Sequence, residues 1–124
     1  MMPAEGQSPV GREVKVTVDR PMGSRHPEHP DLVYEVNYGY VEGILAADGE
    51  WQDADILGVI EPVNNFRGKV VAVIHRKDDV ENKWVVALVG TRFNEQEIRD
   101  QTNFQEKYYD TWIELKLSSD SPNS

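Results

Sequence analysis

Four carboxylates within eight positions are the residues of this sequence best suited to chemistry. They are Asp48, Glu50, Asp53 and Asp55, and Gly49 allows the chain to turn between the first two. Carboxylates that converge on one point repel one another and need a cation, whereas carboxylates that fan out into water do not. Hard divalent ions such as Mg²⁺ and Mn²⁺ prefer oxygen ligands, and Mg²⁺ often binds substrate phosphates as well. The segment is therefore either a solvated acidic loop or a metal site for phosphate chemistry.

Tyrosines are a second group of notable residues. Residues 34–40, YEVNYGY, hold three of them just before the acidic segment, and Tyr108 lies further along the chain. Tyr38 and Tyr108 fit a core in which their hydroxyl groups find partners within the protein.

The composition limits the classes of function. The 124 residues suit one domain with its own core, and the absence of cysteine excludes disulfides and thiolate metal sites. The net charge of −9 argues against a nucleic-acid partner, because the phosphates would be repelled. The apolar runs are far shorter than the roughly 18 residues that cross a bilayer, so we expect no membrane partner. A cytoplasmic location fits this composition.

Runs of β-branched residues predict strands. Val14, Val16 and Val18 alternate with polar residues, which is typical of a half-buried strand. Residues 21–31 contain three prolines and predict a loop. Four later runs predict further strands, at 32–36, 54–60, 69–75 and 83–89. A tyrosine-rich turn and the acidic loop would connect the first two of these runs.

One helix is predicted after the strands. Asn94 and Glu97 have the spacing of a capping box, which favours the start of a helix. Apolar residues then fall on one helical face at steps of four, four and three, namely Phe104, Tyr108, Trp112 and Leu115.

These elements predict a mainly β fold, a five-stranded OB-like barrel, closed or partly open, with a C-terminal α-helix across it. We expect residues 1–12 to form a flexible arm and residues 117–124 a flexible tail. Residues 13–116 would form the single folded domain.

Several motifs resemble those of the soluble, Mg²⁺-dependent inorganic pyrophosphatases of family I. Residues 34–40 resemble the family's Y-P-x-N-Y-G-[YF], and residues 48–53, DGEWQD, resemble its D-G-D-P-x-D, in the right order and at the right separation. Residues 78–83 resemble a later acidic-lysine group, and residues 104–108 resemble a helix that delivers a phosphate-contacting tyrosine. The resemblance covers residues 14–109 and is closest to a short, divergent branch of the family.

The resemblance implies a set of metal ligands for Mg²⁺, with Mn²⁺ as a second possibility. These ligands are Asp19, Asp48, Asp53, Asp78, Asp79 and Asn82. Asp48 and Asp53 would hold the activating pair of ions. Asn82 stands where a metal-binding aspartate is expected, so its neutral carbonyl would weaken the site. The remaining aspartates would hold ions that neutralise the substrate.

The resemblance also implies roles in catalysis and substrate binding. Glu50 sits where the family has its general base, which takes a proton from a metal-bridging water. Tyr38 would tune this base or hydrogen-bond a phosphate oxygen. The implied substrate-binding residues are Arg25, Tyr34, Lys83 and Tyr108.

Two functions follow from these expectations. The first is an inorganic pyrophosphatase, in which a metal-activated water hydrolyses diphosphate to two phosphates, and we expect such a protein to form homo-oligomers. The second is a weak or non-catalytic relative whose barrel binds a metal–phosphate ligand or a protein partner. Asn82 divides the two, because it lowers the number of carboxylates at the metal site.

Overall fold

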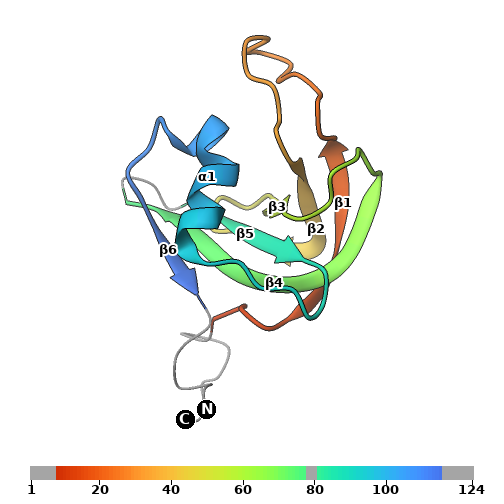
Figure 1. The fold of residues 1–124 in the computed structure, drawn as a ribbon, viewed down its shortest axis with the longest axis vertical. Helices are drawn as coiled ribbons and strands as arrows, with labels where there is room; N and C mark the ends of the chain where they lie inside the picture. Colours follow the sequence, from red (N-terminus) through yellow and green to blue (C-terminus); the bar gives the residue numbers. More distant parts are fainter. Residues whose placement is uncertain (1–7, 78–80, 116–124) are drawn as a thin grey trace.

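The computed structural model describes residues 8–77 and 81–115. In chain order, these residues form β1 (Glu13–Arg20), β2 (Asn37–Leu45), β3 (Trp51–Ile56), β4 (Asn65–Arg76), β5 (Asn82–Ala87), α1 (Glu95–Glu106) and β6 (Thr111–Leu115). Figure 1 shows the strands curving around a common centre, with α1 beside the sheet near β5 and β6. The described part of the chain has no helix that is both long and apolar enough to cross a membrane.

Five of the strands close into a barrel. Their order is β1-β2-β3-β5-β4, and β4 pairs back with β1. The β3–β5 pair is parallel, and the other pairs are antiparallel. β4 is 12 residues long. Besides β5, it pairs with β1 along its first half and with β6 along its second half (Figure 1). The predicted five-stranded barrel with a C-terminal helix is therefore confirmed.

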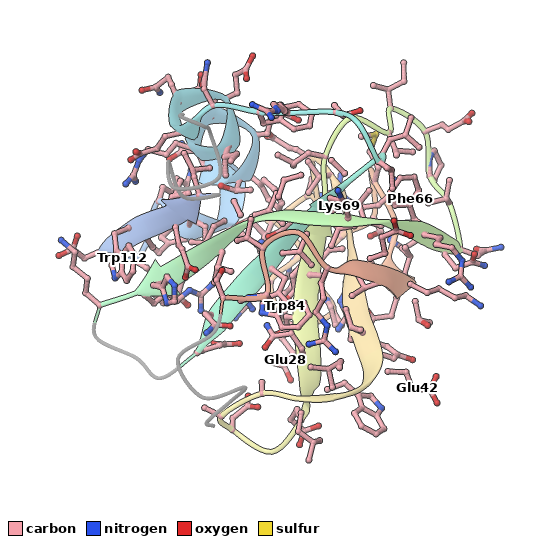
Figure 2. All side chains as sticks on the ribbon, turned by 90° about the horizontal axis from the view of Figure 1, so that it is seen from below. Glu28, Glu42, Phe66, Lys69, Trp84 and Trp112 are labelled. Carbon is pink, nitrogen blue, oxygen red and sulfur yellow. The ribbon has the colours of Figure 1, made fainter. Side chains whose placement is uncertain are left out.

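Apolar side chains pack in two layers, one on each side of the barrel wall. The inner cluster fills the barrel and includes Trp84 of β5, which lies among the strands, whereas Trp112 lies at the edge of the molecule (Figure 2). The outer cluster, which includes Val85, Ile98 and Phe104, packs the wall against α1. Burial of the outer cluster removes apolar surface from water and is the main force that holds α1 to the barrel.

The alternation of side chains along β3 places two carboxylates on the helix side of the wall. Ala54 and Ile56 belong to the inner cluster. Successive strand residues point to opposite faces, so Asp53 and Asp55 point outward, toward the side that α1 covers. The tight spacing of these acidic residues therefore reflects a strand and not only a loop.

Asn37 ties two loops together at one end of the barrel. Its Oδ1 accepts hydrogen bonds from the backbone N–H groups of Met22, at 2.9 Å, and Val63, at 3.2 Å. Its Nδ2 donates to the backbone carbonyl of Glu61, at 2.9 Å. The side chain is fully buried, so these bonds satisfy polar groups that would otherwise be costly to remove from water.

Gly39 lies within β2 and not in the turn that the sequence predicted. A Cβ atom at this position would lie 1.8 Å from the carbonyl oxygen of Thr17 on β1. The glycine therefore permits the close approach of β1 and β2, and the predicted tyrosine-rich turn is wrong.

The predicted strand at residues 32–36 is also wrong. Among the described residues, its pairing is limited to a single bridge between Val33 and Arg25. The N–H of Tyr34 donates to the carbonyl of Ser24 at 2.9 Å, and the carbonyl of Tyr34 accepts from Gly23 at 2.7 Å. The segment thus folds back onto its own loop, and the regular strand begins only at residue 37.

The helix is shorter than predicted, although its start is confirmed. Asn94 and Glu97 form both hydrogen bonds of a capping box. The helix ends at Glu106, and residues 111–115 form β6 against β4. Trp112 and Leu115 have helical spacing, but their segment forms a strand because the edge of β4 offers it backbone hydrogen-bond partners. These hydrogen bonds stabilise the strand more than the weak helix propensity of the segment stabilises a helix.

Candidate active site

A pocket of about 580 Å³ lies on the side of the barrel that α1 covers. The segment between β1 and β2, drawn in orange in Figure 1, projects past the barrel on this same side. The pocket is lined by that segment, by β2, β4, β5 and α1, and by the residues that follow the helix. The lining residues are His26, His29, Asp31, Leu32, Tyr34, Tyr38, Arg76, Glu81, Lys83, Gln105, Tyr108 and Tyr109.

Lys83 is the centre of the polar contacts in this pocket. Its Nζ donates to the hydroxyl oxygen of Tyr38 at 2.6 Å, to Oδ2 of Asp53 at 3.0 Å and to Oε2 of Glu81 at 3.0 Å. An ammonium has three N–H donors, so these three acceptors use all of them. The parallel pairing of β3 and β5, with Ala54 opposite Trp84, is what brings Asp53 beside Lys83.

Lys83 stays charged despite its burial. Its side chain is 6% exposed, and this burial by itself would lower the pKa of the ammonium. Attraction to Asp53 and Glu81 outweighs the burial and raises the pKa of Lys83. The pocket therefore holds a permanent cation, and the two carboxylates beside it are its counter-ions.

Arg76 connects the pocket to the helix. Its Nε and Nη2 atoms donate to the two carboxylate oxygens of Glu106, each at 3.0 Å, and its Nη1 donates to Oε1 of Glu81 at 3.1 Å. The guanidinium carbon lies 3.7 Å from the centre of the Tyr109 ring, which stacks on it. Burial would lower the pKa of Arg76, but the hydrogen bonds and charge of Glu106 raise it.

Together these contacts form a chain of alternating charges, which we call the ion-pair chain. It runs in the order Glu106, Arg76, Glu81, Lys83 and Asp53. Each cation touches two carboxylates, and the chain links α1, β4, β5 and β3. Its members contribute three negative and two positive charges, so the chain carries a net charge of −1.

Asp55 lies beside the ion-pair chain and is fully buried. Nε2 of Gln105 donates to its Oδ1 at 2.9 Å, whereas its Oδ2 has no hydrogen-bond partner among the residues that the structure describes. Burial, with smaller contributions from Glu106 and Asp53, raises the pKa of Asp55 to about 7, although Lys83 opposes the shift. Asp55 thus bears a proton over much of the pH range in which ordinary aspartates are charged.

Aromatic rings hold Tyr38 in place. The ring of Tyr34 stacks on that of Tyr38, with 5.3 Å between centroids, and meets Phe104 edge-on at 5.6 Å. Burial raises the pKa of Tyr38, and the charges of Asp53 and Asp55 raise it further. Tyr38 is therefore a neutral phenol, which can donate a hydrogen bond but does not serve as a base.

Neither a protein-family model nor a curated protein gives a significant sequence match to this chain. Solved structures do match it. The inorganic pyrophosphatase of Ehrlichia chaffeensis has a TM-score of 0.66 at 17% identity, and the match covers 89% of this chain and 90% of that one. The chain has the fold of the bacterial inorganic pyrophosphatases.

Two further pyrophosphatases support this assignment of the fold. The protein from Neisseria gonorrhoeae has a TM-score of 0.60 at 15% identity, over 86% of this chain and 82% of its own. The protein from Coxiella burnetii has a TM-score of 0.57 at 16% identity, over 92% of this chain and 88% of its own. At such identities the likeness concerns the pyrophosphatase fold, and function has to be argued from the side chains of the pocket.

Four of the residues predicted from the sequence line the pocket of this pyrophosphatase fold. They are Tyr34, Tyr38, Lys83 and Tyr108. Asp53 joins them through its contact with Lys83. Their roles stay predictions, but the structure brings these side chains together from β2, β3, β5, the segment before β2 and the residues after α1.

The acidic turn is placed differently. Asp48 and Glu50 lie in the exposed turn between β2 and β3, and they are not among the residues that line the pocket. Oδ1 of Asp48 accepts a hydrogen bond from the N–H of Glu50 at 3.0 Å. Of the carboxylates between residues 48 and 55, only Asp53 and Asp55 point toward the ion-pair chain.

The remaining predicted residues also lie apart from the pocket or outside the described residues. Arg25 donates from Nη1 to the carbonyl of Pro30 at 2.7 Å, and Asp19 pairs with Arg20 at 3.7 Å. Asn82 precedes Lys83 on β5, so its side chain points to the opposite face of the strand. The predicted metal ligands Asp78 and Asp79 lie outside the described residues.

The sequence placed Asp55 among the four carboxylates of the acidic segment, but it did not predict the contacts that Arg76, Glu81, Glu106 and Asp55 make at this pocket. Two of them had a signal in the sequence. Asp55 follows Asp53 by two positions on β3, and Glu81 precedes Lys83 by two, which is the spacing that repeats one face of an extended chain. Glu106 had none, because its contact with Arg76 depends on how α1 packs across the barrel.

The oxygen atoms of the pocket are the type of ligand that a hard divalent cation prefers, but they do not form a complete set of metal ligands. Among residues 8–77 and 81–115, no group of three or more histidine, aspartate or glutamate side chains is placed to hold a metal ion. Asp53 and Glu81 are the two carboxylates that converge, and both contact Lys83. The unpartnered Oδ2 of Asp55 is a further buried oxygen nearby.

Proposed function

We propose that this protein is an inorganic pyrophosphatase that hydrolyses diphosphate to two phosphates with the help of Mg²⁺ or Mn²⁺. The observation that carries the proposal is the contact of Lys83 with Tyr38, Asp53 and Glu81 at a polar pocket of a pyrophosphatase fold. Carboxylates can hold a metal ion, and a permanent cation and a neutral phenol can neutralise and position phosphate oxygens, which is what metal-assisted phosphoryl transfer depends on.

The charge of the pocket supports a need for a metal. Phosphoryl transfer depends on positioning and on neutralising the charge of the phosphates. The ion-pair chain is itself negative by one charge, so it would repel a free diphosphate ion. A divalent cation reverses the local sign and makes an anionic substrate acceptable.

Asp53 and Glu81 are the residues that would hold this ion. When bound, it would neutralise phosphate oxygens and lower the pKa of its water, which makes the water a nucleophile near neutral pH. The predicted metal-binding roles of Asp19, Asp48, Asn82, Asp78 and Asp79 stay predictions, as does that of Glu50 as general base.

The residues that face the phosphates would be Lys83, Tyr38 and Tyr108. Lys83 supplies positive charge, and the phenol of Tyr38 donates a hydrogen bond because its raised pKa keeps it protonated. Tyr108 is exposed at the pocket and can reach a ligand with its hydroxyl group. Tyr34 acts through its stacking on Tyr38 and keeps that phenol in position.

The test is the release of phosphate from diphosphate. We expect release in the presence of Mg²⁺, none in the presence of a chelator, and a loss of at least roughly a hundredfold in Asp53→Asn and Lys83→Met. Lys77→Met is the matched control, since Lys77 is exposed and lies outside the pocket. Absence of release from the wild-type protein with any divalent ion would refute the proposal.

A second function is favoured by a specific observation. The donors of Lys83 are all used within the protein, and the described carboxylates form no three-membered metal group. A barrel of this kind could bind a metal–phosphate ligand without hydrolysing it. Binding of a non-hydrolysable diphosphate analogue by a protein that releases no phosphate would support this function. A cytoplasmic location and homo-oligomer formation stay predictions under both functions.

A further inference from the structure

The ammonium of Lys83 stands at the point where the carboxylates of Asp53 and Glu81 converge. Its Nζ is 3.0 Å from an oxygen of each, and 2.6 Å from the hydroxyl oxygen of Tyr38. The ammonium therefore occupies the point at which both carboxylates contact one cation. A divalent ion and this ammonium therefore compete for the same oxygens.

The same contacts already engage both cations of the pocket. Lys83 has used its three donors, and Arg76 uses three of its five N–H groups in bonds to Glu106 and Glu81. Both side chains are buried, at 6% and 8% exposure. An anion that arrived alone would have to break an ion pair and leave a carboxylate without a partner in a poorly solvated place, which is costly.

A metal ion that arrived alone would meet the corresponding cost. It would take Asp53 and Glu81 from Lys83 and leave a buried ammonium with only the phenol oxygen of Tyr38. The cost disappears when both ligands arrive, because each group then exchanges one partner for another. The ion takes the two carboxylates, and the ammonium takes phosphate oxygens.

We propose that Lys83 makes the binding of a divalent cation and of a phosphate ligand mutually dependent, through exchange of the Asp53–Lys83 and Glu81–Lys83 ion pairs for metal–carboxylate and lysine–phosphate pairs. This inference rests on the proposed function, since it concerns the ligands of the same pocket. Lys83 then acts as an internal counter-ion, which weakens the binding of either ligand when the other is absent.

Titration calorimetry can measure this dependence directly. The probes are Mn²⁺ and imidodiphosphate, each added alone and then in the presence of the other, with the affinity of the two for each other in buffer measured separately. In the wild-type protein we expect each probe to bind at least roughly tenfold more tightly when the other is present, after this correction. Equal affinity of Mn²⁺ with and without imidodiphosphate would overturn the proposal.

Lys83→Met separates this exchange from direct contact between the two ligands. Without the ammonium, Mn²⁺ alone should bind roughly tenfold or more tightly than it does to the wild-type protein, and the mutual dependence should fall to the part that arises from direct contact. Lys77→Met, which removes an exposed lysine, should leave both quantities unchanged. Unchanged dependence in Lys83→Met would assign the coupling to direct contact and refute the exchange.

Thermal unfolding gives a readout that is independent of activity. Lys83→Met should be less stable than the wild-type protein without metal, because Asp53 loses its cation and Glu81 loses one of the two cations that it contacts. Mn²⁺ alone should restore more of the variant's stability than it adds to the wild-type protein. If Lys83→Met does not fold, the wild-type calorimetry still decides the question. Independent binding of both probes would refute only the exchange, whereas no binding of either probe, alone or together, would also refute the proposed function.

Discussion

Nε2 of Gln105 donates a hydrogen bond of 2.9 Å to Oδ1 of Asp55, and this contact joins α1 to β3 in the interior of the protein. It links a helix residue to a strand residue that lies 50 positions earlier in the chain. The other oxygen of Asp55 has no hydrogen-bond partner in the described part of the protein. A fully buried carboxyl group in such surroundings favours its neutral form, which makes the stability of the fold depend on pH.

We expect Asp55→Asn to stabilise the protein at about pH 8 and to have little effect near pH 4. Burial raises the pKa of Asp55 from 3.8 to about 7, so the folded protein binds this proton more tightly than the unfolded chain does. The stability that comes from the proton is present below about pH 4 and is lost as the pH rises toward 7. A shift of this size corresponds to roughly 4 kcal/mol, which the neutral amide retains.

Urea unfolding at the two pH values, in a chelator, measures this effect. Asn at position 55 still accepts the hydrogen bond from Gln105, so the comparison isolates the charge. Asp48→Asn is the control, because Asp48 is exposed in a turn and its substitution should change stability by about 0.5 kcal/mol or less. A variant at position 55 that is no more stable than the wild-type protein at high pH would contradict the expected ionisation.

The ion-pair chain predicts that Arg76→Met is strongly destabilising. Removal of the guanidinium leaves Glu106 and Glu81 without their shared cation, and the loss of one partner of a buried pair costs about 3–5 kcal/mol. Arg76→Lys should recover only part of this loss, since an ammonium does not match the two-point contact with Glu106.

Lys77→Met gives the matched comparison for Arg76. Lys77 pairs with Asp110 at 3.7 Å, and both side chains are exposed, so the pair contributes at most about 1 kcal/mol. Chemical denaturation of the three variants would rank them. Equal stability of Arg76→Met and Lys77→Met would show that the ion-pair chain does not hold α1 to the barrel.

Glycines at two positions should respond differently to the same substitution. Gly39→Ala places a Cβ atom 1.8 Å from the carbonyl oxygen of Thr17, so β1 and β2 have to separate, at a cost above the roughly 1–3 kcal/mol of ordinary overpacking. Gly49→Ala meets no atom within 4 Å, and its positive φ of 89° costs about 1 kcal/mol. Thermal unfolding of both variants is the measurement, and a Gly39→Ala protein as stable as Gly49→Ala would contradict the close strand contact.

Metal affinity should distinguish Glu81 from its neighbour on β5. Glu81 shares the face of Lys83, so we expect Glu81→Gln to weaken the binding of Mn²⁺, measured with imidodiphosphate present, by roughly tenfold, or about 1.4 kcal/mol. Asn82 points to the opposite face, so Asn82→Asp should leave that affinity unchanged and destabilise the fold by adding a charge to a partly buried site. Tighter binding in Asn82→Asp would instead support the metal-ligand role that the sequence predicts for Asn82.

The sequence by itself determined the fold class and the strand core of this protein. The alternation of Val14, Val16 and Val18 and the later β-branched runs predict strands because side chains on a pleated strand repeat every two residues. The capping box at Asn94 and Glu97 is equally local and is confirmed at the start of α1. Local patterns of this kind are sufficient wherever neighbours in the sequence are also neighbours in space.

Only the tertiary structure decided where the helix ends, where β2 begins and which carboxylates share the pocket. Residues 111–115 become β6 because the edge of β4 is present beside them, and no pattern within the segment records that edge. Lys83 meets Asp53, and Arg76 meets Glu106, because barrel closure and helix docking bring together residues that lie 30 positions apart. The attraction between two charges depends on their distance in space and weakens as that distance grows. The linear sequence does not contain that distance.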